Sequence, residues 1–419
     1  MSPGRTDVTL SNGDIERHVL VIITGGTICM QDSPDGLVPT RDFVDNCLRP
    51  SSDFNDGSLF DSTPVTNEHG KGATATTLRA PPRSTNGSRF KYSVFEFSEL
   101  IDSSSMDGSQ WNLMLRSLTH NWSNFDAFVI LHGTDTLAYT ASALAFMLGP
   151  LDKSVIVTGS QLSMYAPNND AHDNLLDALT VAGTYYVPEV GVVFHHHLYR
   201  ATRVTKVSAF SLAAFTTPNA KPLASFPKHA GKAWTASLHL DTITPGVPGD
   251  STYQEASSVT HTRTTMTLDT SRVAVLKVYP GIGANLISSI IQIPDLGGLV
   301  LETFGAGNIP LGTGSKSLLD ILATAVKNGI VVVSVTQCLT GSVTSAYESA
   351  RRMEREGIVT GLDMTTEAAY TKLAYLLSLP NLSRAEIASK MRQNLRGELT
   401  ADFREEQKLR DRAKSEPPS

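Results

Sequence analysis

The chain has few cysteines and no long apolar segment. Its three cysteines, Cys29, Cys47 and Cys338, are far apart among 419 residues, a spacing typical of neither a disulfide framework nor a cysteine-rich metal site. No apolar run approaches the roughly 20 residues that a membrane-spanning helix needs. Residues 1–17 are polar and lack the apolar segment of a signal peptide. We therefore expect a cytoplasmic protein without membrane contact.

Excess positive charge and nucleotide-binding motifs are also absent. The net charge is −6 at pH 7, whereas proteins that bind nucleic acid are usually basic. The glycine pairs at 281–283 and 305–307 lack the GxGxxG pattern, and there is no Walker A motif. His195 and His197 are the obvious metal candidates, but no cysteine or carboxylate cluster at ligand spacing accompanies them. We expect no nucleic acid, no cofactor and no metal ion.

Short apolar strands alternate with helical segments along most of the chain. A hydrophobic content of 41% is that of a soluble globular protein, and the length favours two or three domains. Strands are predicted at 19–23, 92–97, 127–131, 154–157 and 191–194, with helices at 111–118, 138–148 and 170–182. A second set has strands at 273–278, 298–301 and 330–335, with helices at 317–327 and 365–377. The pattern predicts an α/β fold with a larger N-terminal domain, whose mainly parallel sheet is flanked by helices, plus a smaller C-terminal α/β domain.

Changes in composition indicate where these domains begin and end. We predict a polar tail at 1–17, an N-terminal domain at 18–235, a linker with an insertion at 236–271, a C-terminal domain at 272–382 and a helical, charged tail at 383–419. Residues 49–90 are rich in Ser, Thr, Asn, Asp, Gly and Pro. We expect them to form an insertion that is mostly disordered or a long surface loop. The mixed charges of the tail favour a solvated surface over a partner site.

Two of the predicted strands end in a Gly-Thr turn. Residues 19–23 run into TGGT, which ends at Thr27, and residues 127–131 run into HGTD, which contains Thr134 and Asp135. Open α/β sheets bind their ligands at the carboxyl ends of the strands, so we expect the two threonines to face one another across a cleft. Asp135 is either the N-cap of the following helix, which is the commoner role of Asp at that position, or a ligand contact.

Lys206 and Ser103 are further candidates for chemistry. A threonine hydroxyl is a weak nucleophile unless a neighbouring group removes its proton. Lys206 could act as that base if it is buried, or it could be an exposed lysine on a basic loop. Ser103, within IDSSSM, is an ordinary loop serine when taken by itself. The residue types alone leave these alternatives open.

Seven sequence motifs, distributed over both predicted domains, together carry a family resemblance. They are TGGTICM at 24–30, IDSSSM at 101–106, LHGTDTLAYTASAL at 131–144, TGSQLSM at 158–164, RATRVTKVSAFSLAAFTTPNAKPLA at 200–224, TQCLTGSVTSAYESA at 336–350 and GLDMTTEAA at 361–369. In this order they resemble the bacterial-type L-asparaginases, and most closely the type I, cytosolic branch of that family.

The resemblance implies a reaction and a role for each candidate. The reaction is hydrolysis of the side-chain amide of L-asparagine to L-aspartate and ammonia, without metal or organic cofactor. Thr27 would be the primary nucleophile and form an acyl-enzyme. Thr134, Asp135 and Lys206 would form a second triad, in which Lys206 draws the proton from Thr134. The substrate-binding residues would be Gly26, Ser103, Ser104, Gly133 and Asp135, with the α-carboxylate on Ser103 and the α-ammonium on Asp135.

The chain departs from the family pattern at two places. Many relatives carry a tyrosine about ten positions after the nucleophile, where this chain has Leu37, which cannot transfer a proton. Tyr347 resembles a tyrosine that mammalian-like members of this branch place near the site, so we expect it to be the catalytic substitute. Ser105 stands where relatives usually have Asp, which predicts different hydrogen bonding in that loop.

The type I resemblance also implies regulation and assembly. Bacterial members can carry an allosteric asparagine site, whose residues here would be Thr205 and Cys338, although Cys338 could instead be a buried structural cysteine. In this family the active site lies between the N-terminal domain of one subunit and the C-terminal domain of another, so we expect a homodimer or homotetramer. Two alternatives within the same fold are a glutaminase-leaning amidase and the amidotransferase subunit that releases ammonia for misacylated transfer RNA. A third alternative is a catalytically silent amino-acid-binding protein, which is considered because Leu37 replaces the tyrosine of the active-site loop.

Overall fold

The computed structural model describes residues 16–34, 36–82, 89–226, 266–310, 317–344 and 347–400, together with the backbone of a short strand at 237–238. Most of the predicted polar tail, most of the predicted linker at 236–271 and the end of the charged tail lie outside the described residues. In the described part of the chain, no helix is both long enough and apolar enough to cross a bilayer.

The N-terminal unit is built on a ten-stranded sheet. Its order is β14-β13-β10-β9-β8-β7-β1-β6-β5-β4, and the five strands from β9 to β6 run parallel. Antiparallel strands extend the sheet at both edges. The strands are β1 (Arg17–Ile23), β4 (Phe60–Thr66), β5 (Gly72–Ala80), β6 (Phe90–Glu96), β7 (Ala127–Leu131), β8 (Ser154–Thr158), β9 (Val190–Phe194), β10 (His197–Arg200), β13 (Ala224–Ser225) and β14 (Ser237–Leu238).

Helices cover both faces of the parallel strands. Helices α1 (Gly108–Asn121) and α2 (Leu137–Leu148) pack on one face, and α3 (Ala171–Thr184) packs on the other. Every residue of β7, β8 and β9 is buried, as expected for parallel strands that are enclosed on both sides. The α/β class predicted from the alternating strands and helices is confirmed.

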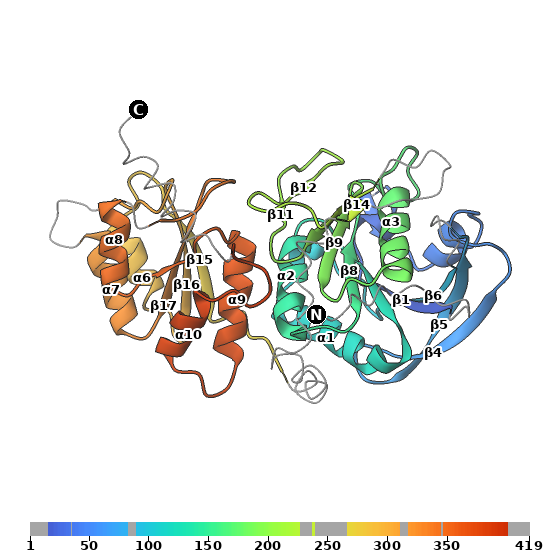
Figure 1. Cartoon of the computed structure of the whole chain (residues 1–419), viewed down its shortest axis with the longest axis horizontal. Coiled ribbons are helices and arrows are strands. Elements are labelled where there is room, and N and C mark those ends of the chain that lie inside the picture. The colour runs from blue at the N-terminus through green and yellow to red at the C-terminus, as the bar shows by residue number, and fades with distance from the viewer. Residues whose placement is uncertain are drawn as a thin grey trace, which may run out of the picture.

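The C-terminal unit has a four-stranded parallel sheet of its own, in the order β15-β16-β17-β18. It lies beside the first unit, with α9 packed against α2 (Figure 1). Its elements are β15 (Val273–Lys277), α6 (Ala284–Ile290), β16 (Gly298–Thr303), α7 (Leu318–Lys327), β17 (Val331–Thr336), α8 (Glu348–Arg355), β18 (Val359–Thr360), α9 (Thr366–Ser378) and α10 (Arg384–Met391).

Two segments differ from the sequence-based expectation. Residues 60–66 form strand β4 at the edge of the sheet and residues 72–80 form strand β5 beside it, so this segment is not a long surface loop. Threonine, which we counted as a loop signal, is β-branched and favours strands; in β5 it alternates with alanine, and Ala75, Thr77 and Leu78 are buried. The charges at 383–400 are not all solvated, because Glu398 is fully buried against Lys372.

Candidate active site

Three turns meet at the carboxyl edge of the large sheet, one each after β1, β6 and β7. Hydrogen bonds join them directly. The backbone N–H and the hydroxyl of Thr24 donate to the carbonyl of Leu131, at 3.1 and 2.8 Å. The N–H of Ile101 donates to the carbonyl of Thr24 at 2.8 Å. The sheet register therefore brings three segments that are distant in sequence to one place.

Glycines allow these turns to approach more closely than side chains would permit. Gly26 has φ 95°, and a Cβ placed there would lie 2.4 Å from the backbone nitrogen of Gly133. A Cβ on Gly133 would in turn lie 2.4 Å from the Oγ of Ser103. The turn that carries Thr27 therefore touches the turn that carries Thr134, with Ser103 alongside.

We expect Gly26→Ala to disrupt the site and destabilise the fold. Its Cβ would overlap the backbone of Gly133, and strain plus overpacking together cost about 2–4 kcal/mol of unfolding free energy. Gly36→Ala is a matched control, because Gly36 has a similar φ of 103° but no atom within 4 Å of its added Cβ. Chemical denaturation of both variants measures the difference. If both variants lose the same unfolding free energy, backbone strain alone, without the close approach to Gly133, explains why glycine is needed at position 26.

Thr27 begins a short 3₁₀ turn, η1 (Thr27–Cys29), at the end of β1. Ile28 and Cys29 are fully buried, whereas Thr27 is only half-buried. The Cys29 thiol donates to the carbonyl of Gly26 at 3.3 Å, and the N–H of Met164 donates to the carbonyl of Ile28 at 3.2 Å. Burial raises the pKa of the Cys29 thiol to about 12, so this thiol stays protonated and packs as an apolar group. Thr27 is the residue of η1 that solvent can reach.

Lys206 joins the second threonine to its neighbouring carboxylate. Its Nζ donates to the Oγ1 of Thr134 at 2.9 Å and to the Oδ1 of Asp135 at 2.8 Å. Thr134 is 7% exposed, and the side chains of Lys206 and Asp135 are 20% and 64% exposed. The structure therefore brings together all three predicted triad members, although 72 residues separate Thr134 from Lys206.

The two roles considered for Asp135 can now be distinguished. Helix α2 has Thr136 at its N-cap, without a side-chain capping hydrogen bond, so Asp135 is not the cap. Its carboxylate instead pairs with Lys206 and faces solvent on its other side. The exposed-loop interpretation of Lys206 is also wrong, because both of its partners come from the turn after β7.

Gln161 is a site residue to which the sequence analysis assigned no role. The Thr134 hydroxyl accepts from Lys206 and donates to the Oε1 of Gln161 at 3.1 Å. The loop of Gln161 is held by Asp170, whose carboxylate accepts from the N–H groups of Gln161 and Leu162 at 3.0 and 2.9 Å. The only available signal was the position of Gln161 just after strand β8, in TGSQ.

Ser103 and Ser104 lie differently in the turn η3 (Ser103–Ser105). Ser103 is 3% exposed and lies against Gly133, and its carbonyl accepts from the hydroxyl of Thr136 at 2.7 Å. Ser104 is exposed, and its N–H donates to the Asp102 side chain at 3.0 Å. Only Ser103 is packed among the three turns.

His132 supports the turn without titrating near neutral pH. It is completely buried, with Nδ1 2.7 Å from the carbonyl of Gly133 and Nε2 2.9 Å from the Oγ1 of Thr140. Burial lowers the pKa of His132 to about 4. The imidazole is therefore neutral at pH 7 and fixes the orientation of the Gly133 peptide.

The four remaining candidates lie on four different segments of the chain. Leu37 is 46% exposed in the hairpin of β2 (Met30–Ser33) and β3 (Gly36–Pro39). Tyr347 is the N-cap of α8 in the C-terminal unit and is 54% exposed. The Thr205 hydroxyl donates to the Oε1 of Glu367 at 2.6 Å. Cys338 is exposed, so the alternative of a buried structural cysteine is wrong.

The histidine run at 195–197 forms a tight connection between β9 and β10. His196 pairs with the buried Asp177, Nδ1 to Oδ2 2.9 Å, and the Nδ1 of His197 lies 2.8 Å from the carbonyl of His195. Among the residues that the structure describes, no group of three or more His, Cys, Asp and Glu is arranged to hold a metal ion.

Family models match both units of the chain. Residues 18–237 match the model "Asparaginase, N-terminal", and residues 272–391 match "Glutaminase/Asparaginase C-terminal domain". L-asparaginase 1 of Escherichia coli K12 is 36% identical over 389 residues, which is 92% of this chain and 99% of that protein. The chain belongs to the asparaginase family. The resemblance inferred from the seven motifs, including its type I branch, is thereby confirmed.

Solved structures and longer proteins also resemble this asparaginase-family chain. The crystal structure of L-asparaginase I from Vibrio cholerae has a TM-score of 0.71 at 32% identity, covering 92% of this chain and 99% of that one. The human protein named 60 kDa lysophospholipase is 38% identical over 395 residues, or 94% of this chain. The chain spans only 63% of the length of that human relative.

Proposed function

We propose that this chain is an L-asparaginase that hydrolyses the side-chain amide of L-asparagine to L-aspartate and ammonia. The observation that carries the proposal is the Lys206–Thr134–Asp135 arrangement, at 2.9 and 2.8 Å, in direct contact with the turn of Thr27. A hydroxyl becomes an effective nucleophile only beside a group that can take its proton. This site has two threonines and a lysine at hydrogen-bonding distance from one of them.

In the first step, the Thr27 hydroxyl oxygen attacks the amide carbon of asparagine. The carbonyl oxygen becomes an oxyanion, for which backbone N–H groups of the glycine turns are suitable donors. When the intermediate collapses, the C–N bond breaks, the nitrogen takes up the proton that the Thr27 hydroxyl gave up on attack and leaves as ammonia, and the acyl group remains on Thr27 as an ester.

In the second step, water hydrolyses the ester and releases aspartate. The Thr134 hydroxyl turns its proton from Gln161 toward Lys206, passes that proton to the lysine and takes up one from the water, so it acts as a relay. When the ester C–O bond breaks, the Thr27 oxygen takes up a proton, which restores the hydroxyl and balances the proton that Lys206 took. This requires Lys206 to be uncharged at that moment. Throughout both steps, the solvent side of Asp135 pairs with the α-ammonium of the substrate. Ser103 and Ser104 bind the α-carboxylate, and Gly26 and Gly133 line the site.

We further propose that a second copy of the chain completes the site. Leu37 cannot take a proton from Thr27, and Tyr347 is exposed on the C-terminal unit, where a neighbouring subunit could receive it. A homodimer or homotetramer in which Tyr347 of one copy lies beside Thr27 of another would supply the missing phenol.

All three cysteines are unpaired, which fits a cytoplasmic location.

Ammonia release from L-asparagine and from L-glutamine tests the function, with fatty-acid release from a lysophospholipid as a third arm because of the name of the human relative. We expect hydrolysis of asparagine, with a kcat/KM above that for glutamine. A higher kcat/KM for glutamine would favour the glutaminase alternative. Binding of asparagine in calorimetry without any ammonia would instead indicate a silent binding protein.

The velocity curve for asparagine tests the proposed allosteric site at Thr205 and Cys338. Thr205 adjoins Lys206 in the chain, and exposure of Cys338 leaves it accessible to a ligand. We expect a sigmoidal dependence of velocity on asparagine concentration. A strictly hyperbolic curve in the same measurements would contradict an activating second site.

A further inference from the structure

Lys206 lies on a hairpin whose base is attached to the C-terminal unit. The hairpin consists of β11 (Thr205–Lys206) and β12 (Phe215–Thr216) and extends from the N-terminal unit near the seam between the two units (Figure 1). Asn219 follows β12 and exchanges two hydrogen bonds with the backbone of Gly341, at 2.9 and 2.8 Å. Arg203 precedes β11 and makes a larger set of contacts on the other side.

Arg203 is held by a buried cluster from the C-terminal unit. Its Nη1 donates to the carbonyl of Glu398 at 2.7 Å, and its Nη2 donates to the Oδ2 of Asp363 at 2.9 Å and to the Oγ1 of Thr400 at 2.8 Å. The side chains of Arg203 and Asp363 are only 5% and 2% exposed. Thr400 also donates to Asp363 through its N–H and its hydroxyl, at 3.1 and 2.5 Å. Charge-assisted hydrogen bonds of this kind fix geometry strongly.

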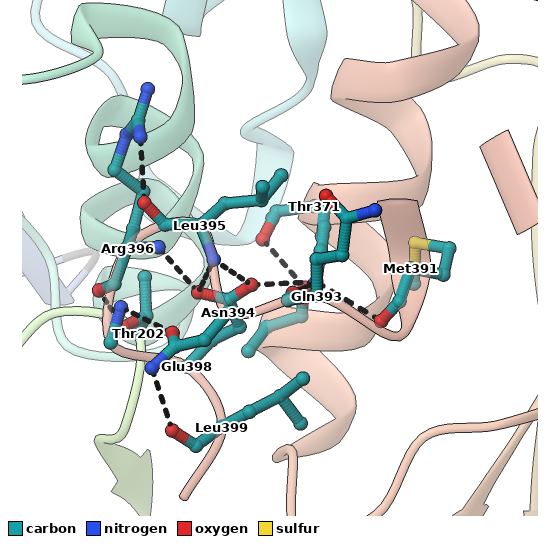
Figure 2. Close-up of polar contacts among 12 residues, drawn as sticks. Thr202, Thr371, Met391, Gln393, Asn394, Leu395, Arg396, Glu398 and Leu399 are labelled. Carbon is teal, nitrogen blue, oxygen red and sulfur yellow. Dashed lines mark hydrogen bonds and ion pairs between the residues drawn. The ribbon is translucent and has the colours of Figure 1, made fainter. Parts of the chain in front are cut away.

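Residues 392–400, here called the C-terminal strap, supply two of these partners. Within the strap, the N–H groups of Leu395 and Arg396 donate to the carboxylate of Glu398, at 2.9 and 2.6 Å (Figure 2). Lys372 of α9 donates to that carboxylate at 2.6 Å and to the carbonyls of Met391 and Gln393 at 3.0 and 2.5 Å. All three protons of the buried ammonium therefore have an acceptor, so the strap has a defined conformation.

The strap also lies directly against the segment that leads into Lys206. The Thr202 hydroxyl donates to the carbonyl of Arg396 at 2.9 Å. Gly397 has φ 77°, and a Cβ there would lie 2.5 Å from the Cδ of Arg200. The strap lies beyond residue 391, where the match to the C-terminal family model ends. Residues 200–203 thus pack against a segment that neither family model covers.

We propose that Arg203, Asp363 and Thr400 are positioning residues that place the Lys206 amine against Thr134. The proposal rests on the proposed function, in which Lys206 takes a proton from that hydroxyl. At the tip of the hairpin, Phe210 is 94% exposed, and the carbonyl of Ser211 accepts a hydrogen bond of 3.3 Å from the Nε2 of Gln161. The buried, charge-assisted contacts of Arg203 at the base constrain the direction of the two strands more strongly than this one neutral contact. A displacement of about 1 Å in a reacting group can cost on the order of 100-fold in rate, so a small tilt at Arg203 is enough to slow proton transfer.

Thr400→Val tests the proposal with little change in shape. It removes the hydroxyl that bridges Arg203 and Asp363, and we expect kcat for asparagine to fall about 10-fold, with KM within about twofold of wild type. Thr400→Ser keeps the hydroxyl and should restore kcat. Thr371→Val is the matched control: it removes a buried 2.8 Å hydrogen bond between Thr371 and Ser142, which joins the same two units through α9 and α2 and does not involve Arg203. Its kcat should equal that of wild type.

A second measurement reports on the position of the Lys206 amine independently of enzymatic activity. Trace acetylation, followed by mass spectrometry of the peptides, gives the reactivity of the Lys206 amine relative to the exposed Lys221. In Thr400→Val we expect Lys206 to become severalfold more reactive, because it leaves Thr134 and Asp135; Thr400→Ser and Thr371→Val should match wild type. Should Thr400→Val fail to fold, Thr400→Ala, which removes the same hydroxyl and leaves the Arg203–Asp363 ion pair in place, is used in both measurements.

The outcomes separate this proposal from the proposed function. Unchanged Lys206 reactivity in Thr400→Val overturns the positioning role, whatever kcat does. An equal loss of kcat in Thr371→Val also overturns it, because general loosening of the interface would then explain the effect. If the wild type releases no ammonia from any amide, the proposed function fails, while the acetylation pattern still decides whether the cluster positions Lys206.

Discussion

Thr27→Ala should abolish ammonia release from asparagine, lowering kcat by roughly three orders of magnitude or more, as removal of a nucleophile does in other acyl-transfer enzymes. The substitution removes the hydroxyl that is proposed to form the ester. Thr27 is half-buried at the start of η1, and the turn is held by Ile28 and Cys29. The melting temperature should therefore stay close to that of wild type, so the loss of rate reports chemistry.

Thr27→Ser is the matched variant, because it keeps the hydroxyl and loses only a methyl group. It should retain measurable activity, and a quenched reaction should show an acyl adduct on the peptide that contains residue 27. Ammonia release that persists in Thr27→Ala would contradict the assignment and move the nucleophile to Thr134. The same comparison made with Thr134→Val would then decide between the two threonines.

The central strands and the two Gly-Thr turns could be predicted from sequence because their causes are local. Parallel strands that are buried on both faces must be apolar throughout, and the strand that the sequence predicts at 127–131 coincides with β7 (Ala127–Leu131). A turn at the end of such a strand lies at the carboxyl edge of the sheet. This is why Thr27 and Thr134 could be placed near one another before the fold was known.

Contacts between distant segments could not be predicted in the same way. Strand β4 lies at the edge of the sheet, and both β4 and its neighbour β5 carry exposed residues, so their threonines and alanines resemble a loop until a partner strand is present. Gln161 has no distinctive pattern, and its role depends on the register of β8 beside β7. The burial of Glu398 depends on Lys372, which lies in α9. Each of these features depends on contacts between segments that are distant in sequence, and the local composition carries no information about such contacts.

Lys206→Met should lower kcat for asparagine by about 10²- to 10⁴-fold, the range that general acid–base groups contribute. Methionine keeps much of the length of the side chain but cannot accept a proton. Stability should change little, because an ion pair whose carboxylate is 64% exposed contributes only about 0–1 kcal/mol. Lys221→Met is the control, since Lys221 is an exposed lysine downstream of the same hairpin; its kcat should be unchanged.

Lys206→Arg distinguishes proton transfer from charge alone. Arginine keeps a positive charge beside Thr134 and Asp135 but does not lose its proton in proteins. If Lys206 takes the proton that Thr134 relays, Lys206→Arg should be nearly as slow as Lys206→Met, and added small primary amines should partly restore the rate of the methionine variant. If the arginine variant instead regains most of kcat, the ammonium acts by holding Thr134 and Asp135 in place. The water that cleaves the ester must then lose its proton to another group, and the phenol of Tyr347 from a second copy is the next residue to test.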